Sequence, residues 1–217
     1  MTILVVTRSP FYSKQLWVGR QHFLRILELL GHIISYQGTS LWLVPQPSLP
    51  ASTTLQGVIE SLSKTHSSPC FPPHVTLASL PTCISPQEIV SCLSSQQQVT
   101  LSFEQVRTGT TFYQSVFIAI QPSPQLSQLH QHVHRTLGIQ PRTPEFPHLS
   151  LYYGDEGKVE IVRRLKEDGI TQNVNGKLAV DGITEFLGME VWVVSCVGRP
   201  EEWSVTDKIS LNPHSSG

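Results

Sequence analysis

One five-residue pattern occurs twice in the sequence, and this repetition constrains the fold more strongly than any other feature. Proline, histidine, an apolar residue, serine or threonine and a second apolar residue follow one another at both places, with the two histidines 74 residues apart. Alternate side chains of a β-strand point to the same face of its sheet. The pattern therefore predicts two strands, one presenting His74 and Thr76 together and the other presenting His148 and Ser150 together.

Each histidine strand lies within a similar series of expected elements. Apolar runs bounded by proline or glycine indicate strands, and Ser-Pro pairs indicate helix starts. In chain order we expect a strand at 41–44, a helix from Ser52 or Thr53 to about 64, a strand at 74–80, a helix after Ser85 to about 94, strands at 99–103 and 112–120, a helix after Ser123 to 137, a strand at 148–153, a helix at 155–167, and strands at 189–197 and 204–211. This order predicts an α+β fold of two similar lobes, each an antiparallel sheet with outer helices, related by a pseudo-twofold axis and forming a central cleft.

Residues 1–38 differ in composition from the rest of the chain. They carry four basic residues and one acid, with apolar residues at helical spacing between Ile26 and Ile34. Such a segment fits a peripheral helix, a poorly ordered extension or an organelle presequence. We therefore treat 1–38 as an N-terminal extension of uncertain structure, followed by a bilobal domain at 39–217.

The charge of the chain restricts the ligands that it can bind. The formal net charge is −1, and residues 39–217 carry −4 because residues 1–38 contribute +3. General duplex-binding proteins carry a basic excess, so we expect no duplex nucleic acid as partner, whereas a few local donors suffice for a small phosphorylated molecule. No uncharged apolar run approaches the ~20 residues of a membrane-spanning helix, and the four cysteines form no C-x-x-C pair. These features indicate a cytoplasmic protein with no transmembrane segment.

The paired motifs resemble those of the two-histidine (2H) phosphoesterase superfamily, most closely its plant and fungal cyclic phosphodiesterase branch. Three further stretches carry the resemblance, at 40–45, at 107–114 and at 201–205 together with 211–213. The resemblance covers 39–217. The chain departs from the plant members at 138–144, because this loop lacks the cysteine pair that those members carry.

The resemblance implies an enzyme that hydrolyses 2′,3′-cyclic nucleotides to nucleoside 2′-phosphates, or ADP-ribose 1″,2″-cyclic phosphate to ADP-ribose 1″-phosphate, in the context of tRNA splicing metabolism. His74 and His148 are then the acid/base pair, since histidine titrates near neutral pH. Thr76 and Ser150 would donate hydrogen bonds to the phosphoryl oxygens. This chemistry requires no metal ion and no cofactor, and we expect a monomer. Fungal relatives make the Golgi an alternative location.

Four aromatic residues are candidates for further contacts with the substrate. By the same resemblance, Tyr153 lies near the phosphate, although strict alternation along the strand places it opposite His148, so that it needs a strand end or a bulge to reach the cleft. Trp42, Phe112 and Tyr113 are candidates for contact with the base or ribose. Each of these four side chains also fits a purely structural place in the core.

Three other functions remain open from the sequence. A zinc site at His130, His132 and His134 lacks the H-E-x-x-H or C-x-x-C pattern that would supply further ligands. An RNA end-processing enzyme of the same fold needs a longer basic groove than a net charge of −4 suggests. A non-catalytic nucleotide-binding module would keep the cleft, but this chain retains both histidines and both hydroxyls.

Overall fold

The computed structural model describes residues 38–213, except 82, 144–145 and 156. The predicted N-terminal extension therefore lies outside the described residues, apart from Gly38. The strands are β1 (Gly38–Pro45), β2 (Val75–Leu80), β3 (Val99–Thr108), β4 (Val116–Ile120), β5 (His148–Tyr152), β6 (Thr171–Val174), β7 (Lys177–Val180), β8 (Glu185–Cys196) and β9 (Ser204–Ser210). The helices are α2 (Pro50–His66), α3 (Pro86–Leu93), α4 (Pro124–Thr136) and α5 (Lys158–Glu167), with 3₁₀ turns η2 (Phe112–Gln114) and η3 (Pro200–Glu202).

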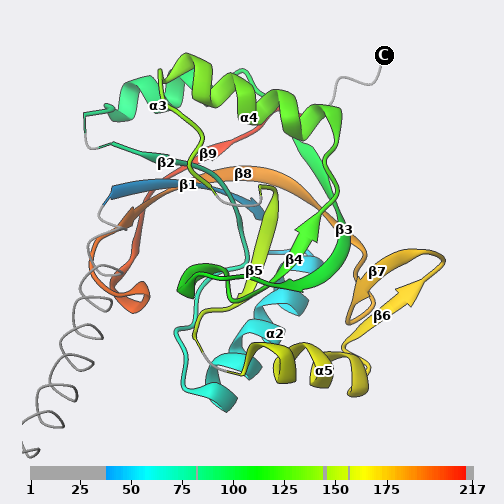
Figure 1. Cartoon of the computed structure of the whole chain (residues 1–217). Coiled ribbons are helices and arrows are strands. Elements are labelled where there is room, and N and C mark those ends of the chain that lie inside the picture. The colour runs from blue at the N-terminus through cyan, green and yellow to red at the C-terminus, as the bar shows by residue number, and fades with distance from the viewer. Residues whose placement is uncertain (1–37, 82, 144–145, 156, 214–217) are drawn as a thin grey trace, which may run out of the picture. The chain divides into compact units, whose positions relative to one another are not determined.

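The order of elements repeats once, as the sequence predicts. The series β1-α2-β2-α3 is followed, after β3, by the series β4-α4-β5-α5, so β2 and β5 occupy equivalent places. Seven strands form one antiparallel sheet in the order β1-β2-β5-β4-β3-β8-β9. The long strand β8 pairs with β3 near its start and with β1 along most of its length, so it joins the two halves (Figure 1).

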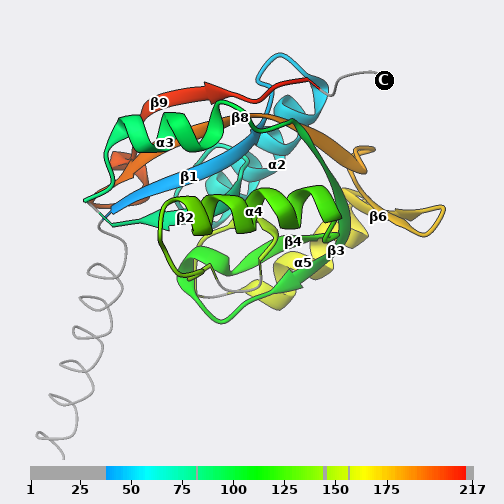
Figure 2. The same cartoon turned by 90° about the horizontal axis from the view of Figure 1, so that it is seen from above.

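The helices lie outside this sheet on two sides, α3 and α4 on one and α2 and α5 on the other (Figures 1 and 2). The helix of each half packs against the histidine strand of the other half, α2 on β5 and α4 on β2. Their apolar residues and one face of each strand form a continuous core. Ser85 and Ser123 each accept a hydrogen bond from the backbone N–H three residues later, and proline follows at the first helical position, which fixes these helix starts.

The structure differs from the sequence prediction at several elements. Strand β3 extends to Thr108 instead of ending at 103, and β8 begins at Glu185 instead of 189. The expected strand at 112–120 is interrupted, because Phe112–Gln114 forms the 3₁₀ turn η2 and only Val116–Ile120 pairs in the sheet. Helix α5 begins at Lys158, since Gly157 before it has a positive φ of 71°. The hairpin β6-β7 has no counterpart in the prediction, although its turn is the Asn175-Gly176 pair, with φ angles of 52° and 80° that such turns require.

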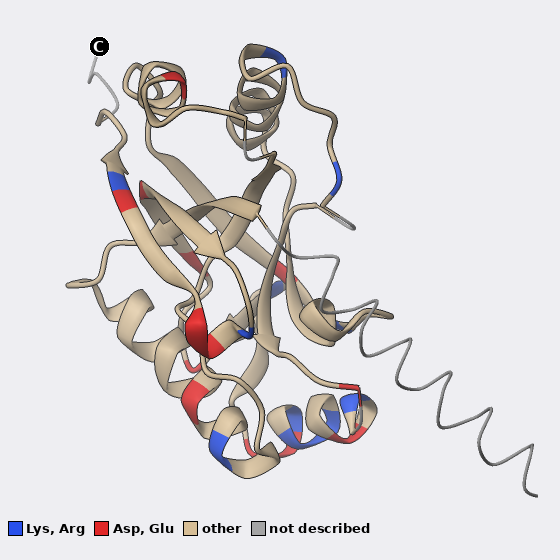
Figure 3. Cartoon of the chain, turned by 90° about the vertical axis from the view of Figure 1, so that its left-hand side faces the viewer, with Lys and Arg blue, Asp and Glu red and all other residues tan. Residues whose placement is uncertain are grey.

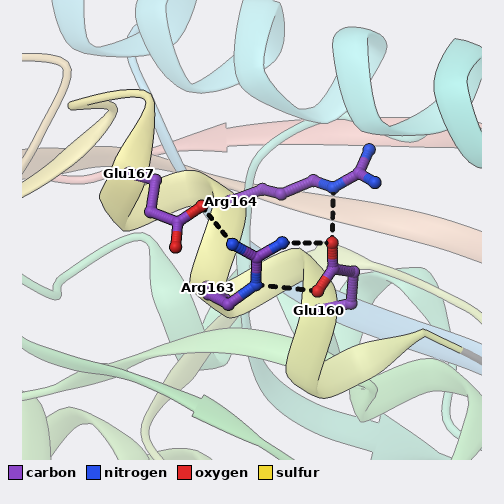
Figure 4. Close-up of polar contacts among 4 residues, drawn as sticks. All are labelled: Glu160, Arg163, Arg164 and Glu167. Carbon is purple, nitrogen blue, oxygen red and sulfur yellow. Dashed lines mark hydrogen bonds and ion pairs between the residues drawn. The ribbon is translucent and has the colours of Figure 1, made fainter.

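The surface carries charges of both signs. Basic and acidic residues are interspersed along the helix at the lower right of Figure 3. On α5, Glu160 accepts hydrogen bonds from Arg163 and Arg164, with ion-pair distances of 2.6 Å and 2.8 Å, and Arg163 also pairs with Glu167 (Figure 4). The hydrogen bonds from these arginines lower the pKa of Glu160 to about 2. Within the described residues, no helix is both long and apolar enough to cross a membrane.

Candidate active site

The two histidine motifs lie side by side where β2 pairs with β5. These strands pair antiparallel through a bridge between Val75 and Leu149, and both of these side chains are fully buried in the core. Extending the register by one residue on each side places His74 opposite Ser150 and Thr76 opposite His148. All four polar side chains of the two motifs therefore lie on one face of the sheet, opposite the core. This register is consistent with the prediction that the two motifs line one site.

Two rows of side chains continue this face into β4 and β3. One row runs from His148 to Ala119, and the other runs from Ser150 to Phe117 and on to Arg107, because these residues are partners in the strand registers. The alternating residues Val116 and Ile118 point into the core on the other face. The site face therefore extends well beyond the two motifs.

His74 lies in a closed, apolar environment. Its ring stacks on the indole of Trp42, with centroids 3.7 Å apart and planes inclined by 8°. The Phe71 ring meets it edge-on, with centroids 6.0 Å apart. Its Nδ1 lies 2.6 Å from the carbonyl oxygen of Pro72. A carbonyl only accepts hydrogen bonds, so Nδ1 carries the proton and Nε2 has a free lone pair in the neutral ring. The pKa of His74 is lowered to about 4, mainly by burial; the hydrogen bond to Pro72 opposes this shift and the nearby His148 adds to it.

His148 has different neighbours. The ring of Phe117 meets it edge-on, with centroids 5.2 Å apart and planes inclined by 65°. The side-chain amide of Gln114 lies at its Nδ1, with Nε2 of Gln114 3.5 Å away. An amide can present either its NH₂ group or its oxygen to the ring, so Gln114 can serve His148 as the neutral imidazole or as the imidazolium. Gln114 was not predicted as a site residue, although it lies within the stretch 107–114 that carries the family resemblance.

The turn η2 holds both Gln114 and a partner of Ser150 in place. The Ser150 hydroxyl donates to the carbonyl oxygen of Tyr113 at 3.0 Å. The fully buried Ser115 donates to the carbonyl of Phe112 at 2.8 Å and accepts from the N–H of Gly154 at 3.0 Å. These bonds tie the turn before β4 to the chain after β5.

Gly109 lies close to the same turn. A Cβ atom at Gly109 would lie 1.9 Å from the carbonyl oxygen of Gln114, so the turn requires a glycine there. On the other side, Lys158 of α5 donates to the Gly109 carbonyl at 3.2 Å. The position of Gln114 beside His148 therefore depends on Gly109, in the loop after β3, and on Lys158 of α5, which holds Gly109 in place.

The predicted aromatic residues belong to one cluster, which contacts His74 through Trp42 and Phe71. Tyr153 follows the end of β5, where a register shift between Val116 and Phe117 interrupts strict alternation. It stacks on Phe71 with centroids 3.8 Å apart and contacts Tyr113 edge-on at 5.4 Å. Phe112 contacts Tyr113 and Tyr153 at the edge of the same cluster.

Trp42 and Trp203 complete the aromatic cluster. Trp42 is only 3% exposed, because the His74 ring covers one of its faces. Trp203, half-buried before β9, lies 5.9 Å from Trp42 and 5.5 Å from Tyr113. Phe71 and Trp203 were not predicted as site residues. Trp203 lies within a stretch of family resemblance, whereas nothing in the local sequence marks Phe71.

Residues 37–211 match the family model of the cyclic phosphodiesterase-like proteins. The chain belongs to this family. Membership confirms the predicted cyclic phosphodiesterase branch of the 2H phosphoesterases, and with it the predicted enzyme class at the level of the family.

Two curated relatives are similar to this chain along most of their length. A cyclic phosphodiesterase of Arabidopsis thaliana is 26% identical over 164 residues, which span 70% of this chain and 90% of the plant protein. A 2′,3′-cyclic-nucleotide 3′-phosphodiesterase of Kluyveromyces lactis is 25% identical over 212 residues, which span 81% of this chain and 99% of the yeast protein.

Solved structures with lower sequence identity share the fold. Escherichia coli LigT in its apo form matches with a TM-score of 0.52 and 16% identity, covering 82% of this chain and 98% of LigT. A Thermus thermophilus protein, TT0787, matches with a TM-score of 0.51 and 12% identity, covering 82% of this chain and all of that protein. These likenesses confirm the predicted α+β fold class.

The three histidines of α4 point to different neighbours. His130 and His134 share a helix face, with ring centroids 4.1 Å apart, and His130 also stacks on Phe146. His132 instead lies 3.0 Å from the Cys92 carbonyl. Burial lowers the pKa of His130 to about 4. Among the described residues, no group of three or more His, Cys, Asp or Glu side chains is placed to hold a metal ion.

Proposed function

We propose that this enzyme hydrolyses 2′,3′-cyclic nucleotides to nucleoside 2′-phosphates, with His74 as general base and His148 as general acid. One observation carries the proposal. Two imidazoles flank the same antiparallel bridge on one face of the sheet, and their Nδ1 atoms meet different partners. The names of the plant and yeast relatives support this substrate class.

The hydrogen bond from His74 to Pro72 leaves its Nε2 lone pair free to accept a proton. The lowered pKa of His74, about 4, keeps the ring neutral at physiological pH. Nε2 takes a proton from water while the water oxygen forms a bond to phosphorus. Neutral imidazole is the form that a general base requires.

On the opposite side of the phosphorus atom, the bond to the 3′ oxygen breaks. The imidazolium of His148 donates a proton to this oxygen, which becomes the 3′ hydroxyl, and the phosphate remains on the 2′ oxygen. The proton lost by water and the proton gained by the ribose balance, so each turnover requires only proton exchange between the two rings through solvent. The amide of Gln114 turns its oxygen toward Nδ1 when His148 is charged.

The hydroxyls of Thr76 and Ser150 donate to the non-bridging phosphoryl oxygens as negative charge develops. Ser150 must first exchange its hydrogen bond to the Tyr113 carbonyl for one to the phosphate. Charged acceptors form the stronger hydrogen bonds, so this exchange favours the phosphate. Trp42 holds the His74 ring by stacking, and the aromatic cluster closes the site on that side.

The same scheme applies to ADP-ribose 1″,2″-cyclic phosphate, which is also a five-membered cyclic phosphodiester, with ADP-ribose 1″-phosphate as the product. No step of the scheme uses a metal ion or a cofactor. The substrate is a small molecule, and the scheme requires one copy of the chain.

The test is to incubate the purified protein with adenosine 2′,3′-cyclic phosphate in a buffer containing EDTA and to identify the product by ³¹P NMR. We expect adenosine 2′-phosphate at an undiminished rate. Formation of the 3′ isomer would contradict the proposed leaving atom, and loss of activity that added metal restores would contradict the metal-free scheme. Binding without turnover would support the non-catalytic module instead.

A further inference from the structure

An open groove of about 730 Å³ is lined by residues of β3, of β4 and of the segment before β5, and His148 follows one of them, Pro147, in the chain. Two of its lining residues, Phe117 and Ala119 of β4, are the neighbours of the second motif, since Ala119 is the strand partner of His148 and Phe117 that of Ser150. Phe146, Pro147 and Arg107 contribute further lining. The groove therefore adjoins the proposed general acid through its strand partner Ala119 and its chain neighbour Pro147.

The direction of the proposed reaction points the substrate into this groove. An in-line displacement places the attacking water, the phosphorus and the leaving oxygen on one line. If His74 activates the water and His148 protonates the leaving 3′ oxygen, the ribose lies on the His148 side of the phosphorus. The His74 side is occupied by Trp42 and Phe71, whereas the His148 side continues as the groove.

The lining of the groove suits the two chemical parts of a nucleotide. Phe117, Ala119 and Pro147 form an apolar surface that a ribose and base can cover. Arg107 of β3 adds a guanidinium, and its register with Phe117 places it in the same cross-strand row as Ser150. Two strand spacings, roughly 10 Å, separate the backbones of Arg107 and Ser150.

Arg107 is available for an anionic ligand. Its side chain is 41% exposed and pairs at 3.3 Å with Glu104, 42% exposed, which also lines the groove. Its Nε and Nη2 also donate to the side-chain oxygen of Gln105, at 2.6 Å and 2.5 Å. An exposed pair of this kind stabilises the fold only weakly, because solvent screens the two charges. A phosphate, which binds a guanidinium through two parallel hydrogen bonds, can therefore replace Glu104 as partner at little cost.

We propose that this groove binds the ribose and base of the substrate, and that Arg107 binds a second phosphate carried at the 5′ end of that nucleoside. The inference rests on the proposed function, since it uses the positions assigned to the acid and the base. It makes Arg107 a specificity residue that favours 5′-phosphorylated cyclic nucleotides over those with a free 5′ hydroxyl.

The test compares kcat/KM for adenosine 2′,3′-cyclic phosphate and for its 5′-phosphorylated counterpart in the unmodified enzyme and in Arg107→Gln. We expect the unmodified enzyme to prefer the 5′-phosphorylated substrate. In Arg107→Gln the ratio of the two kcat/KM values should fall about tenfold, through a higher KM for the 5′-phosphorylated substrate, because one charge-assisted contact is lost. Arg107→Lys should restore part of the preference. Arg135→Gln, an exposed arginine of α4 outside the groove, is the matched control and should keep the ratio.

An unchanged substrate ratio in Arg107→Gln would overturn the inference while leaving the proposed function in place. Absence of turnover with both substrates would instead overturn the proposed function. In that case calorimetric binding of adenosine 2′,5′-bisphosphate and of adenosine 2′-phosphate still decides the role of Arg107. Tighter binding of the bisphosphate that Arg107→Gln abolishes supports the inference, and equal affinities in the unmodified protein contradict it.

Discussion

The two halves of the sheet place equivalent residues in different settings. Trp42 on β1 is the strand partner of Thr76, and Phe117 on β4 is the strand partner of Ser150, so the two aromatic residues hold corresponding positions beside the two motifs. Trp42 stacks face to face on His74 at 3.7 Å, whereas Phe117 meets His148 edge-on at 5.2 Å.

This difference shows how two copies of one motif acquire different chemistry. Both histidines are buried, and the first half gives Nδ1 of His74 a carbonyl acceptor, which favours a neutral ring with a free Nε2. The second half gives Nδ1 an amide that can turn, and opens onto a groove. The motif supplies an imidazole and a hydroxyl, and the residues around it determine which imidazole acts as the base.

Removal of either imidazole should have the largest effect. We expect His74→Ala and His148→Ala each to lower kcat by about 10²–10⁴-fold, since each removes one proton transfer. Circular dichroism and thermal unfolding serve as controls for folding. Near-normal turnover by either folded variant would show that its ring has no part in the reaction.

Replacement of the hydroxyls should cost less and should differ between the halves. Loss of one donor to a developing charge typically costs about 10²–10³-fold in kcat. We expect Thr76→Val to reach this range and Ser150→Ala to fall at its lower end, because Ser150 gives up its bond to Tyr113 in order to act. Steady-state kinetics of both variants test this order, and a larger loss in Ser150→Ala would reverse it.

Gln114→Leu should lower kcat by about tenfold, since it removes one hydrogen bond to a charged ring. Gln114→Glu, which accepts but does not donate at neutral pH, should retain more activity because it stabilises the imidazolium of His148. If both variants matched the unmodified enzyme, Gln114 would have no role in orienting or charging that ring.

Replacement of Trp42 should change the pH dependence of kcat/KM more than its value at neutral pH. Trp42→Leu exposes His74 to water and should raise its pKa from about 4 toward the ordinary value of 6.5. A base acts only when unprotonated, so kcat/KM falls as pH falls through this pKa, and the acidic limb should move upward. Phe117→Leu, the equivalent change beside His148, should leave this limb in place. Identical limbs in all three proteins would contradict the role assigned to burial by Trp42.

Much of the fold can be predicted from the sequence, because apolar alternation and Ser-Pro caps mark most elements locally. The turn at Phe112–Gln114 cannot be predicted in this way, since two aromatic residues typical of strands open it. Hydrogen bonds of Ser115 with Phe112 and with the distant Gly154 fix it. The hairpin β6-β7 does carry a readable signal in Asn175-Gly176.

The residues of the candidate site also fall into those that local sequence marks and those that only long-range contacts bring in. Its four motif residues can be predicted, because each pair is set by spacing within one strand. Gln114, Phe71 and Arg107 depend on registers and turns that join residues far apart in the chain. Tyr153 reaches the cluster only because a register shift ends the alternation of β5.

The most direct measurement of the difference between the halves is a pH titration of the histidine side chains by ¹H–¹⁵N NMR, with assignment through His74→Gln and His148→Gln. We expect His74 to remain neutral, with its proton on Nδ1, until the pH falls to about 4. A His74 ring that titrates near 6.5, or that carries its neutral proton on Nε2, would contradict its assignment as the general base.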